Sequence, residues 1–234
     1  MTDSQERLVI FDFDGVLIDS ENIALEELRN CICAHGVEID LAETRARFLG
    51  RSVADHMAFI TERTGQPCPE SFRSDWHDRL YSRYRRELQL VHGAAETLSG
   101  LDEAGIPYAI ATGGAVERLD VGLECAGLTS RFAGRAFSVE LVARGKPAPD
   151  IFIYTSEQLR MSAANCLVVE DSPHGIRGAV AAGMQTVGFV GASHFAGIRY
   201  EATEILSAAG ADLVVVDHAA LLDRILRWAG GLSD

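Results

Sequence analysis

The sequence predicts an α/β protein whose parallel sheet is interrupted, near its start, by an inserted all-helical region. The apolar run that begins at Leu8 is typical of a strand buried on both faces. After Gly93, helix-like and strand-like segments alternate, and this alternation favours a parallel sheet with right-handed crossovers. Between Asp19 and Leu90 the sequence has no strand pattern. We therefore expect a core built from residues 1–18 and 90–234 and a helical domain built from residues 19–89.

The expected core strands are short apolar or β-branched runs that end at glycine or at polar residues. They cover residues 8–13, 107–112, 135–138, 166–170, 186–189 and 212–216. The helices between them mostly end at a glycine. They cover residues 94–104, a stretch that ends at Gly127, a stretch from Pro149 to about residue 160, residues 173–182 and a closing stretch after residue 216. Residues 192–198 show no clear pattern.

The inserted region is expected to form helices that glycine or proline separates. They cover a stretch from a predicted cap at Asp19 and Ser20 to a stop at His35 and Gly36, and then residues 41–48, 52–64 and 70–88. In the last of these, Phe72, Trp76, Leu80 and Tyr84 recur every four residues, which indicates one packed face.

The composition is that of an ordinary globular protein with an acidic balance. Of 234 residues, 47% are hydrophobic and 24% are charged, and the formal net charge is -13. Because this charge repels phosphate backbones and anionic head groups, we expect neither a nucleic acid nor a membrane as a partner. We expect a monomer or a weak homo-oligomer.

Cysteine usage and the first residues indicate a cytoplasmic protein. The five cysteines are odd in number and form no C-x-x-C pair, which favours reduced thiols. Residues 1–7 are polar, and acids soon interrupt the apolar run that follows them. We therefore predict neither a signal peptide nor a membrane-spanning helix.

Two carboxylates, Asp12 and Asp14, stand at the end of the first expected strand, directly before Gly15. Residues two apart in an extended chain point to the same side, so these acids would repel each other if nothing neutralised them. A hard divalent cation such as Mg²⁺, held by few carboxylates and a substrate phosphate, would neutralise them. The alternative is that the two aspartates only cap a turn.

Polar residues also follow two later strands. Thr112 precedes two glycines, and Glu170, Asp171 and Ser172 end the strand at 166–170. Because parallel strands share one direction, their carboxyl ends meet at one edge, where α/β proteins bind ligands. Each residue alone could instead serve a turn or a helix N-terminus. The occurrence of all of them at strand ends favours a single polar site at this edge, which we call the mouth.

Lys146, in Gly145-Lys146-Pro147, is the single lysine of a chain that has 20 arginines. An ammonium is a compact point charge, unlike a planar guanidinium. This indicates that the position needs a point charge beside converging anions such as Asp12 and a bound phosphate. The alternative is the chance survival of one surface lysine.

Four segments, in this order, resemble the motifs of the haloacid dehalogenase superfamily, in the branch that contains β-phosphoglucomutase and many small-molecule phosphatases. They are Phe11–Gly15, Ala111–Gly113, Gly145–Pro147 and Val169–Ile176, the last continuing to Ala181–Gly183. The resemblance covers essentially the full length. It implies a Rossmann-like core with helices on both faces of its sheet and a mobile cap formed by the helical insertion.

The resemblance also implies roles for the acids. Asp12 would attack phosphorus and form an aspartyl-phosphate. Asp14 would protonate the leaving oxygen and later deprotonate the water that hydrolyses this intermediate. Mg²⁺ would bind the carboxylate of Asp12, the backbone carbonyl of Asp14 and Asp171, with Glu170 nearby.

The phosphoryl group would be held by Thr112, by the backbone N–H of Gly113 and by Lys146, which would also offset the charge of Asp12. The expected function is therefore a Mg²⁺-dependent phosphatase acting on a small phosphorylated metabolite, such as a sugar phosphate or a phosphorylated sugar acid. Chelation of the ion should abolish its activity.

Other activities of the superfamily fit this sequence less well. Dehalogenases lack the second aspartate of the first motif, so Asp14 favours phosphoryl transfer. Phosphonoacetaldehyde hydrolases need a cap lysine, and Lys146 lies in the core. A sugar phosphomutase of the β-phosphoglucomutase type remains an alternative, although Ala24 stands where such chains have a cap-hinge histidine. A non-catalytic metabolite sensor is the other alternative. The presence of Asp12, Asp14 and Asp171 argues against it, because a protein that only binds needs no second, proton-carrying acid.

Substrate choice is expected to come from the cap. Between Arg45 and Arg86 the sequence has nine arginines and five acids, a local positive surplus that could attract phosphorylated metabolites. Arg51, in the loop Leu49–Ser52, is the expected substrate-binding residue, because this loop reaches the mouth in similar proteins. We expect His174, beside the acids, to be an exposed residue of a first helical turn.

Overall fold

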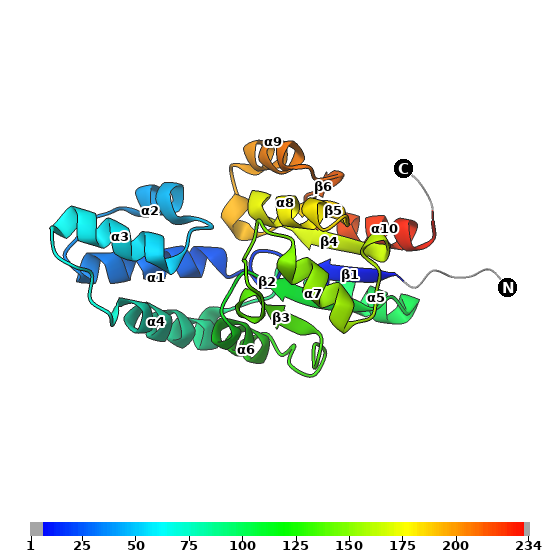
Figure 1. The fold of residues 1–234 in the computed structure, drawn as a ribbon, viewed down its shortest axis with the longest axis horizontal. Coiled ribbons are helices and arrows are strands. Elements are labelled where there is room, and N and C mark those ends of the chain that lie inside the picture. The colour runs from blue at the N-terminus through cyan, green and yellow to red at the C-terminus, as the bar shows by residue number, and fades with distance from the viewer. Residues whose placement is uncertain (1–6, 232–234) are drawn as a thin grey trace. The chain divides into compact units, whose positions relative to one another are not determined.

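A computed structural model describes residues 7–231 and shows a six-stranded parallel sheet with the strand order β3-β2-β1-β4-β5-β6 (Figure 1). The strands are β1 (Leu8–Phe11), β2 (Tyr108–Thr112), β3 (Ala136–Ser138), β4 (Cys166–Glu170), β5 (Gln185–Phe189) and β6 (Leu213–Val215). The prediction of an α/β protein with a parallel sheet is therefore confirmed. The predicted core also included residues 1–6 and 232–234, which lie outside the described residues.

Helices cover both faces of this sheet. On one face, Ile151 and Phe152 of α7 (Asp150–Gln158) and Ala179 of α8 (Pro173–Ala181) pack in one buried cluster with Leu8, Ile10 and Val168. On the other face, Phe189 of β5 contacts the ring of His218 in α10 (His218–Ala229). Thr97 of α5 (Ala94–Ala104) donates a hydrogen bond to the backbone oxygen of His218. The strands are buried on both sides because each face carries helices.

The chain divides into two compact units, which we call the core unit (Met1–Asp19 and Gln89–Asp234) and the helical unit (Ser20–Leu88). The helical unit contains α1 (Glu21–Ala34), α2 (Leu41–Phe48), α3 (Val53–Thr64) and α4 (Phe72–Glu87). Its interior is aromatic: the ring of His56 lies 5.0 Å from that of Phe48 and 5.4 Å from that of Trp76, centroid to centroid. The helices predicted in this region all occur, within two residues of the expected limits.

Several segments of the core unit differ from the prediction. Strand β1 ends at Phe11 rather than at residue 13, because the chain turns at once: Gly15 donates its backbone N–H to Ile18. Residues 193–195, for which no structure was predicted, form a short 3₁₀ helix. Helix α9 (Arg199–Ala209) was not predicted at all. Its buried residues Ala202, Leu206 and Ala209 follow the helical spacing of four and three, so the signal was present.

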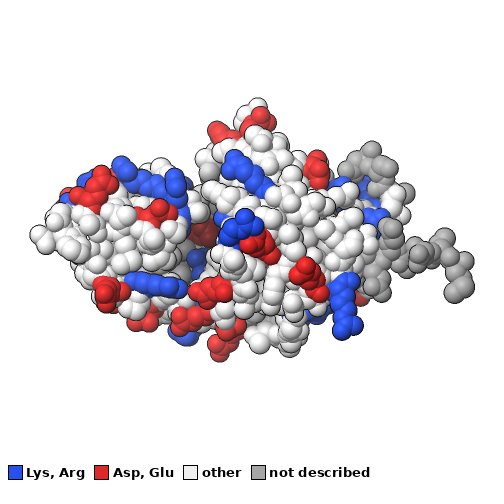
Figure 2. All heavy atoms as spheres, in the orientation of Figure 1, with Lys and Arg blue, Asp and Glu red and all other residues white. Residues whose placement is uncertain are grey.

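The two units differ in charge. The helical unit has ten arginines and twelve acids, a net charge of -2, so the core unit carries the remaining -11. The positive surplus expected between Arg45 and Arg86 is thus offset by acids elsewhere in that unit. Arg83, for example, binds Glu26 and Glu87. In Figure 2, basic and acidic side chains alternate over the visible face of the helical unit.

Within residues 7–231, no helix combines the length and the apolar character needed to cross a membrane. The five cysteines are free thiols, and Cys31 and Cys166 are buried.

Candidate active site

The register of the sheet brings the polar strand ends together. Phe11 pairs with Ile110 of β2 and with Val169 of β4, so the chain after each of these residues emerges at the same edge. The backbone N–H of Asp12 extends the pairing by donating to the carbonyl of Val169 at 2.9 Å. Glu170 is the next residue of β4. The predicted meeting of these strand ends at one edge is what the structure shows.

Lys146 is the centre of this cluster. Its Nζ donates to Oδ1 of Asp12 at 2.7 Å, to the backbone oxygen of Ala111 at 2.9 Å and to Oε1 of Glu170. Only 9% of the lysine side chain is exposed. Burial alone would lower the pKa of Lys146, but the charges of Asp12 and Glu170 outweigh it and raise the pKa above its usual value. The ammonium is therefore charged at neutral pH.

Three carboxylates converge beside this ammonium. Asp12, Glu170 and Asp171 each offer one carboxylate oxygen, and these three oxygens lie within 4.8 Å of one another. Asp12 has its pKa raised to about 7, mainly by burial, then by the charges of Glu170 and Asp14, while Lys146 acts in the opposite direction. One ammonium against three carboxylates leaves a negative excess. An all-oxygen donor set with such an excess fits a hard divalent cation.

Two glycines allow this close approach. A Cβ on Gly15 would lie 2.0 Å from Oδ2 of Asp171, and the φ of Gly15 is +74°, a left-handed conformation that favours glycine. A Cβ on Gly175, in the first turn of α8, would lie 1.8 Å from Cδ of Glu170. Ser172 caps that helix by accepting the N–H of Gly175, and its own hydroxyl donates to Oε2 of Glu170. A larger residue at position 15 or 175 would therefore displace the acid beside it.

The carboxylate of Asp14 lies outside the three-carboxylate group and binds an arginine that the sequence analysis did not single out. Nη2 of Arg118, in α6 (Val116–Cys125), lies 2.6 Å from Oδ1 of Asp14. Thr112 belongs to the same region and is buried, and its Oγ1 accepts the backbone N–H of Gly114 at 2.9 Å. Gly113 lies between Thr112 and Gly114, in the loop that connects β2 to α6.

His194 is a second neighbour that was not predicted. It is buried, and its Nε2 lies 3.4 Å from Oδ2 of Asp171. It belongs to the short 3₁₀ helix at 193–195, where the sequence shows no clear pattern. His174, by contrast, is exposed, as expected.

Arg51, the predicted substrate-binding residue, belongs to the helical unit. It is exposed and stands in the loop between α2 and α3, directly before Ser52, which caps α3 by accepting the N–H of Asp55. Ala24, which occupies the position where β-phosphoglucomutase-like chains have a histidine, is buried in α1.

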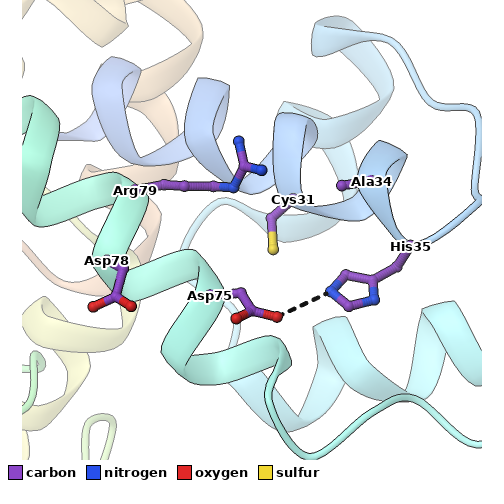
Figure 3. Close-up of a pocket in the computed structure, with 6 residues that line it drawn as sticks. All are labelled: Cys31, Ala34, His35, Asp75, Asp78 and Arg79. Atoms are coloured by element: carbon purple, nitrogen blue, oxygen red, sulfur yellow. Dashed lines mark ion pairs between the residues drawn. The ribbon is translucent and has the colours of Figure 1, made fainter.

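A pocket of about 440 Å³ lies between α1 and α4 of the helical unit (Figure 3). It is lined by Cys31, Ala34, His35, Asp75, Asp78 and Arg79. Nε2 of His35 lies 3.7 Å from Oδ2 of Asp75. Burial raises the pKa of the Cys31 thiol to about 11, so this cysteine is not a thiolate at neutral pH. The pocket contains none of the predicted site residues.

Comparisons with known proteins agree with this geometry. The family model for haloacid dehalogenase-like hydrolases matches residues 6–183. A crystal structure from Agrobacterium tumefaciens, described as a conserved haloacid dehalogenase-like protein of unknown function, is 34% identical, with a TM-score of 0.80 over 96% of this chain and 99% of that one.

Several curated relatives carry phosphatase names, among them the following two. Hexitol phosphatase A of Escherichia coli is 29% identical over 76% of this chain and 80% of its own length. The bifunctional riboflavin kinase/FMN phosphatase of Arabidopsis thaliana is 29% identical over 80% of this chain, which spans only half (50%) of that longer protein. The family match covers most of the chain and includes every motif quoted above. The chain is therefore a hydrolase and belongs to the haloacid dehalogenase-like family, as its ordered motifs predict.

Proposed function

We propose that this protein is a Mg²⁺-dependent phosphatase that hydrolyses a small phosphorylated metabolite, such as a sugar phosphate or a phosphorylated sugar acid, through an aspartyl-phosphate. The observation that carries the proposal is the group of three carboxylates, Asp12, Glu170 and Asp171, of which the buried Asp12 and Glu170 bind the ammonium of Lys146. The phosphatase names of the two curated relatives support it.

The residues present fit a divalent cation. Asp12 and Asp171 would hold it together with the backbone carbonyl of Asp14, and Glu170 stands beside them. When bound, the ion would supply the positive charge that the site lacks and would draw the phosphoryl oxygens toward Asp12. Lys146 contributes one positive charge of its own, which is too little for three carboxylates and an anionic substrate.

Asp12 is the proposed nucleophile. Its contact with Lys146 fixes the rotation of the carboxylate and stabilises its ionised form. A carboxylate oxygen would attack phosphorus, and the bond from phosphorus to the ester oxygen would break. Asp14 would give its proton to the departing alcohol. In the second step Asp14 would take a proton from water, the water oxygen would attack phosphorus, and inorganic phosphate would leave, restoring the Asp12 carboxylate.

The phosphoryl oxygens would be held by the loop after β2. Thr112 offers a hydroxyl and Gly113 a backbone N–H there, and Lys146 approaches the same loop through the backbone oxygen of Ala111. These donors would face the charge that develops on the transferring group.

Inorganic phosphate release from a panel of phosphorylated metabolites, measured with Mg²⁺ and again after chelation, tests this proposal. We expect Mg²⁺-dependent turnover of at least one sugar phosphate or phosphorylated sugar acid, and none with the Asp12→Asn variant. Undiminished turnover by Asp12→Asn would overturn the proposed nucleophile. Assaying a hexose 1-phosphate for both free phosphate and hexose 6-phosphate separates hydrolysis from phosphoryl transfer within the sugar.

Arg51 is proposed to select the substrate. The Arg51→Ala variant should lose preference within the panel while it still hydrolyses a generic aryl phosphate. Arg85→Ala is the matched control, because Arg85 is an exposed arginine of α4 in the same unit. If both variants keep the wild-type preference, Arg51 has no such role.

We also infer a cytoplasmic protein, monomeric or weakly oligomeric, that works on free metabolites. Its five free cysteines and its net charge of -13 support this. Cell fractionation tests the location, and light scattering of the purified protein tests the oligomeric state.

A further inference from the structure

Arg118 is not among the residues to which the family motifs assign a role, yet it contacts one of them. Its Nη2 lies 2.6 Å from Oδ1 of Asp14, a short charge-assisted hydrogen bond. Only 15% of the Arg118 side chain and 12% of the Asp14 side chain are exposed. An ion pair so shielded from water holds its geometry far better than an exposed pair of flexible side chains.

The backbone places this arginine directly after the loop between β2 and α6, the loop that is proposed to hold the phosphoryl oxygens. Gly114 ends that loop, and α6 begins two residues later. The position that a Cβ on Gly114 would take lies 3.3 Å from Oγ1 of Thr112, 3.5 Å from Cδ of Arg118 and 3.6 Å from Oδ2 of Asp14. The hydroxyl of Thr112, the side chain of Arg118 and the carboxylate of Asp14 thus all lie around this one glycine.

We propose that Arg118 is a positioning residue, which orients the carboxylate of Asp14 for proton delivery to the leaving oxygen. This inference rests on the proposed function. Arg118 donates to Oδ1, so Oδ2 is left to carry the proton that is delivered. The same contact restricts rotation of the carboxyl group and keeps Oδ2 on the side of Thr112. Proton transfer depends steeply on such placement, and a shift of about 1 Å can cost on the order of a hundredfold in rate.

A positioning role predicts a dependence on the leaving group that a general loss of structure does not. An alkoxide leaves poorly and needs its proton during bond breaking, whereas p-nitrophenolate leaves without one. The parameter kcat/KM reports only the steps up to departure of the alcohol. Removing Arg118 should therefore lower kcat/KM strongly for an alkyl phosphate and weakly for p-nitrophenyl phosphate.

The experiment compares kcat/KM for an alkyl phosphate that the wild type hydrolyses and for p-nitrophenyl phosphate. We expect the aryl-to-alkyl ratio to rise at least about tenfold in Arg118→Met. Asp14→Asn should raise it in the same direction and further. Arg118→Lys should restore part of the alkyl activity, because it keeps a cation beside Asp14. If Arg118→Met does not fold, the ratio is measured in Arg118→Lys instead. Arg131→Gln, which breaks the pair between Arg131 and Asp102, should leave the ratio unchanged.

The outcomes separate this inference from the proposal on which it rests. A wild type that hydrolyses both esters, with Arg118→Met and Arg118→Lys lowering both equally or neither, overturns the positioning role alone. A wild type without turnover of any phosphate ester overturns the proposed function and this inference with it. A selective loss on the alkyl ester that Arg131→Gln does not show supports the role of Arg118.

Discussion

The ammonium of Lys146 lies 2.7 Å from the Asp12 carboxylate although 134 positions separate the two residues in the chain. The same ammonium also binds Glu170, and Asp171 stands beside them. A buried group with more negative than positive charges is costly to form, since each ion loses its hydration and only part of the charge is paired. This excess of negative charge fits a bound cation, and its effect on the ion-free protein can be measured.

Removing the lysine should destabilise the folded protein. Lys146→Met leaves two buried carboxylates without their cation, and breaking a buried pair in this way typically costs about 3–5 kcal/mol. Urea unfolding at pH 8, above the pKa of Asp12, measures the loss. The control is Arg144→Met, because Arg144 binds Asp150 in an exposed pair, which water and salt screen and which should contribute little to stability. Equal stability of the two variants would contradict the central role of Lys146.

Mg²⁺ affinity should rise with pH. The pKa of Asp12 is raised to about 7 in the protein without an ion, mainly by burial, and a carboxylate must lose its proton to bind a metal. Between pH 6 and pH 8 the affinity should therefore increase about tenfold, and binding at pH 6 should release close to one proton. Calorimetry in buffers of different ionisation enthalpy measures both quantities. Asp12→Asn should abolish the proton release, and a pH-independent affinity would contradict this assignment.

The raised pKa of Asp12 also determines how the stability of the ion-free protein changes with pH. Because the pKa of Asp12 is higher in the folded state than its ordinary value of 3.8, the folded state holds an extra proton between about pH 4 and pH 7. This residue therefore makes the free energy of unfolding fall as the pH rises through that window. Urea unfolding with chelator should show this fall in the wild type and a weaker one in Asp12→Asn.

An alanine at position 15 should disrupt metal binding. Its Cβ would lie 2.0 Å from the Asp171 carboxylate, so this acid would have to move. We expect Gly15→Ala to weaken Mg²⁺ affinity by roughly 10–100-fold, the usual range for disturbing the surroundings of a ligand. Gly127→Ala is the control, because Gly127 has a similar φ of +68° and nothing within 4 Å of its Cβ position. Equal Mg²⁺ affinities by calorimetry would show that Asp171 can move without consequence.

The part of the site that follows from strand order was predictable from the sequence. Thr112 and Glu170 end parallel strands and Asp12 directly follows one, and neighbouring parallel strands deliver such residues to one edge. Lys146 could be found because it is the single lysine and stands in a recognisable motif. The predicted helices of the insertion followed from apolar spacing and from glycine and proline stops, which are local signals.

Residues placed by tertiary packing were not predictable. Arg118 is one of 20 arginines, and nothing near it in sequence marks a contact with a residue 104 positions away. His194 lies in a segment without periodicity, and its approach to Asp171 depends on how the chain after β5 folds back. The missed helix α9 is different, since the spacing of Ala202, Leu206 and Ala209 could have revealed it.

The buried histidine of the helical unit should make that unit sensitive to acid. His56 is 2% exposed, and both of its ring nitrogens lack a hydrogen-bond partner among the described residues. Burial lowers its pKa from 6.5 to about 4, so the folded state binds fewer protons than the unfolded state between these values. The free energy of unfolding should therefore fall as the pH is lowered from 6.5, by up to about 3 kcal/mol at pH 4.

His56→Leu isolates this contribution from other groups that titrate in the same range, such as His218, whose pKa is also lowered by burial. The ring of His56 packs against apolar and aromatic neighbours, so a leucine of similar volume should cost less than about 1.5 kcal/mol at pH 7. Urea unfolding at pH 7 and pH 4.5 should show a smaller acid loss in the variant than in the wild type. Parallel losses in the two proteins would mean that His56 becomes protonated in the folded state at its ordinary pKa, and therefore that the helical unit opens to water around it.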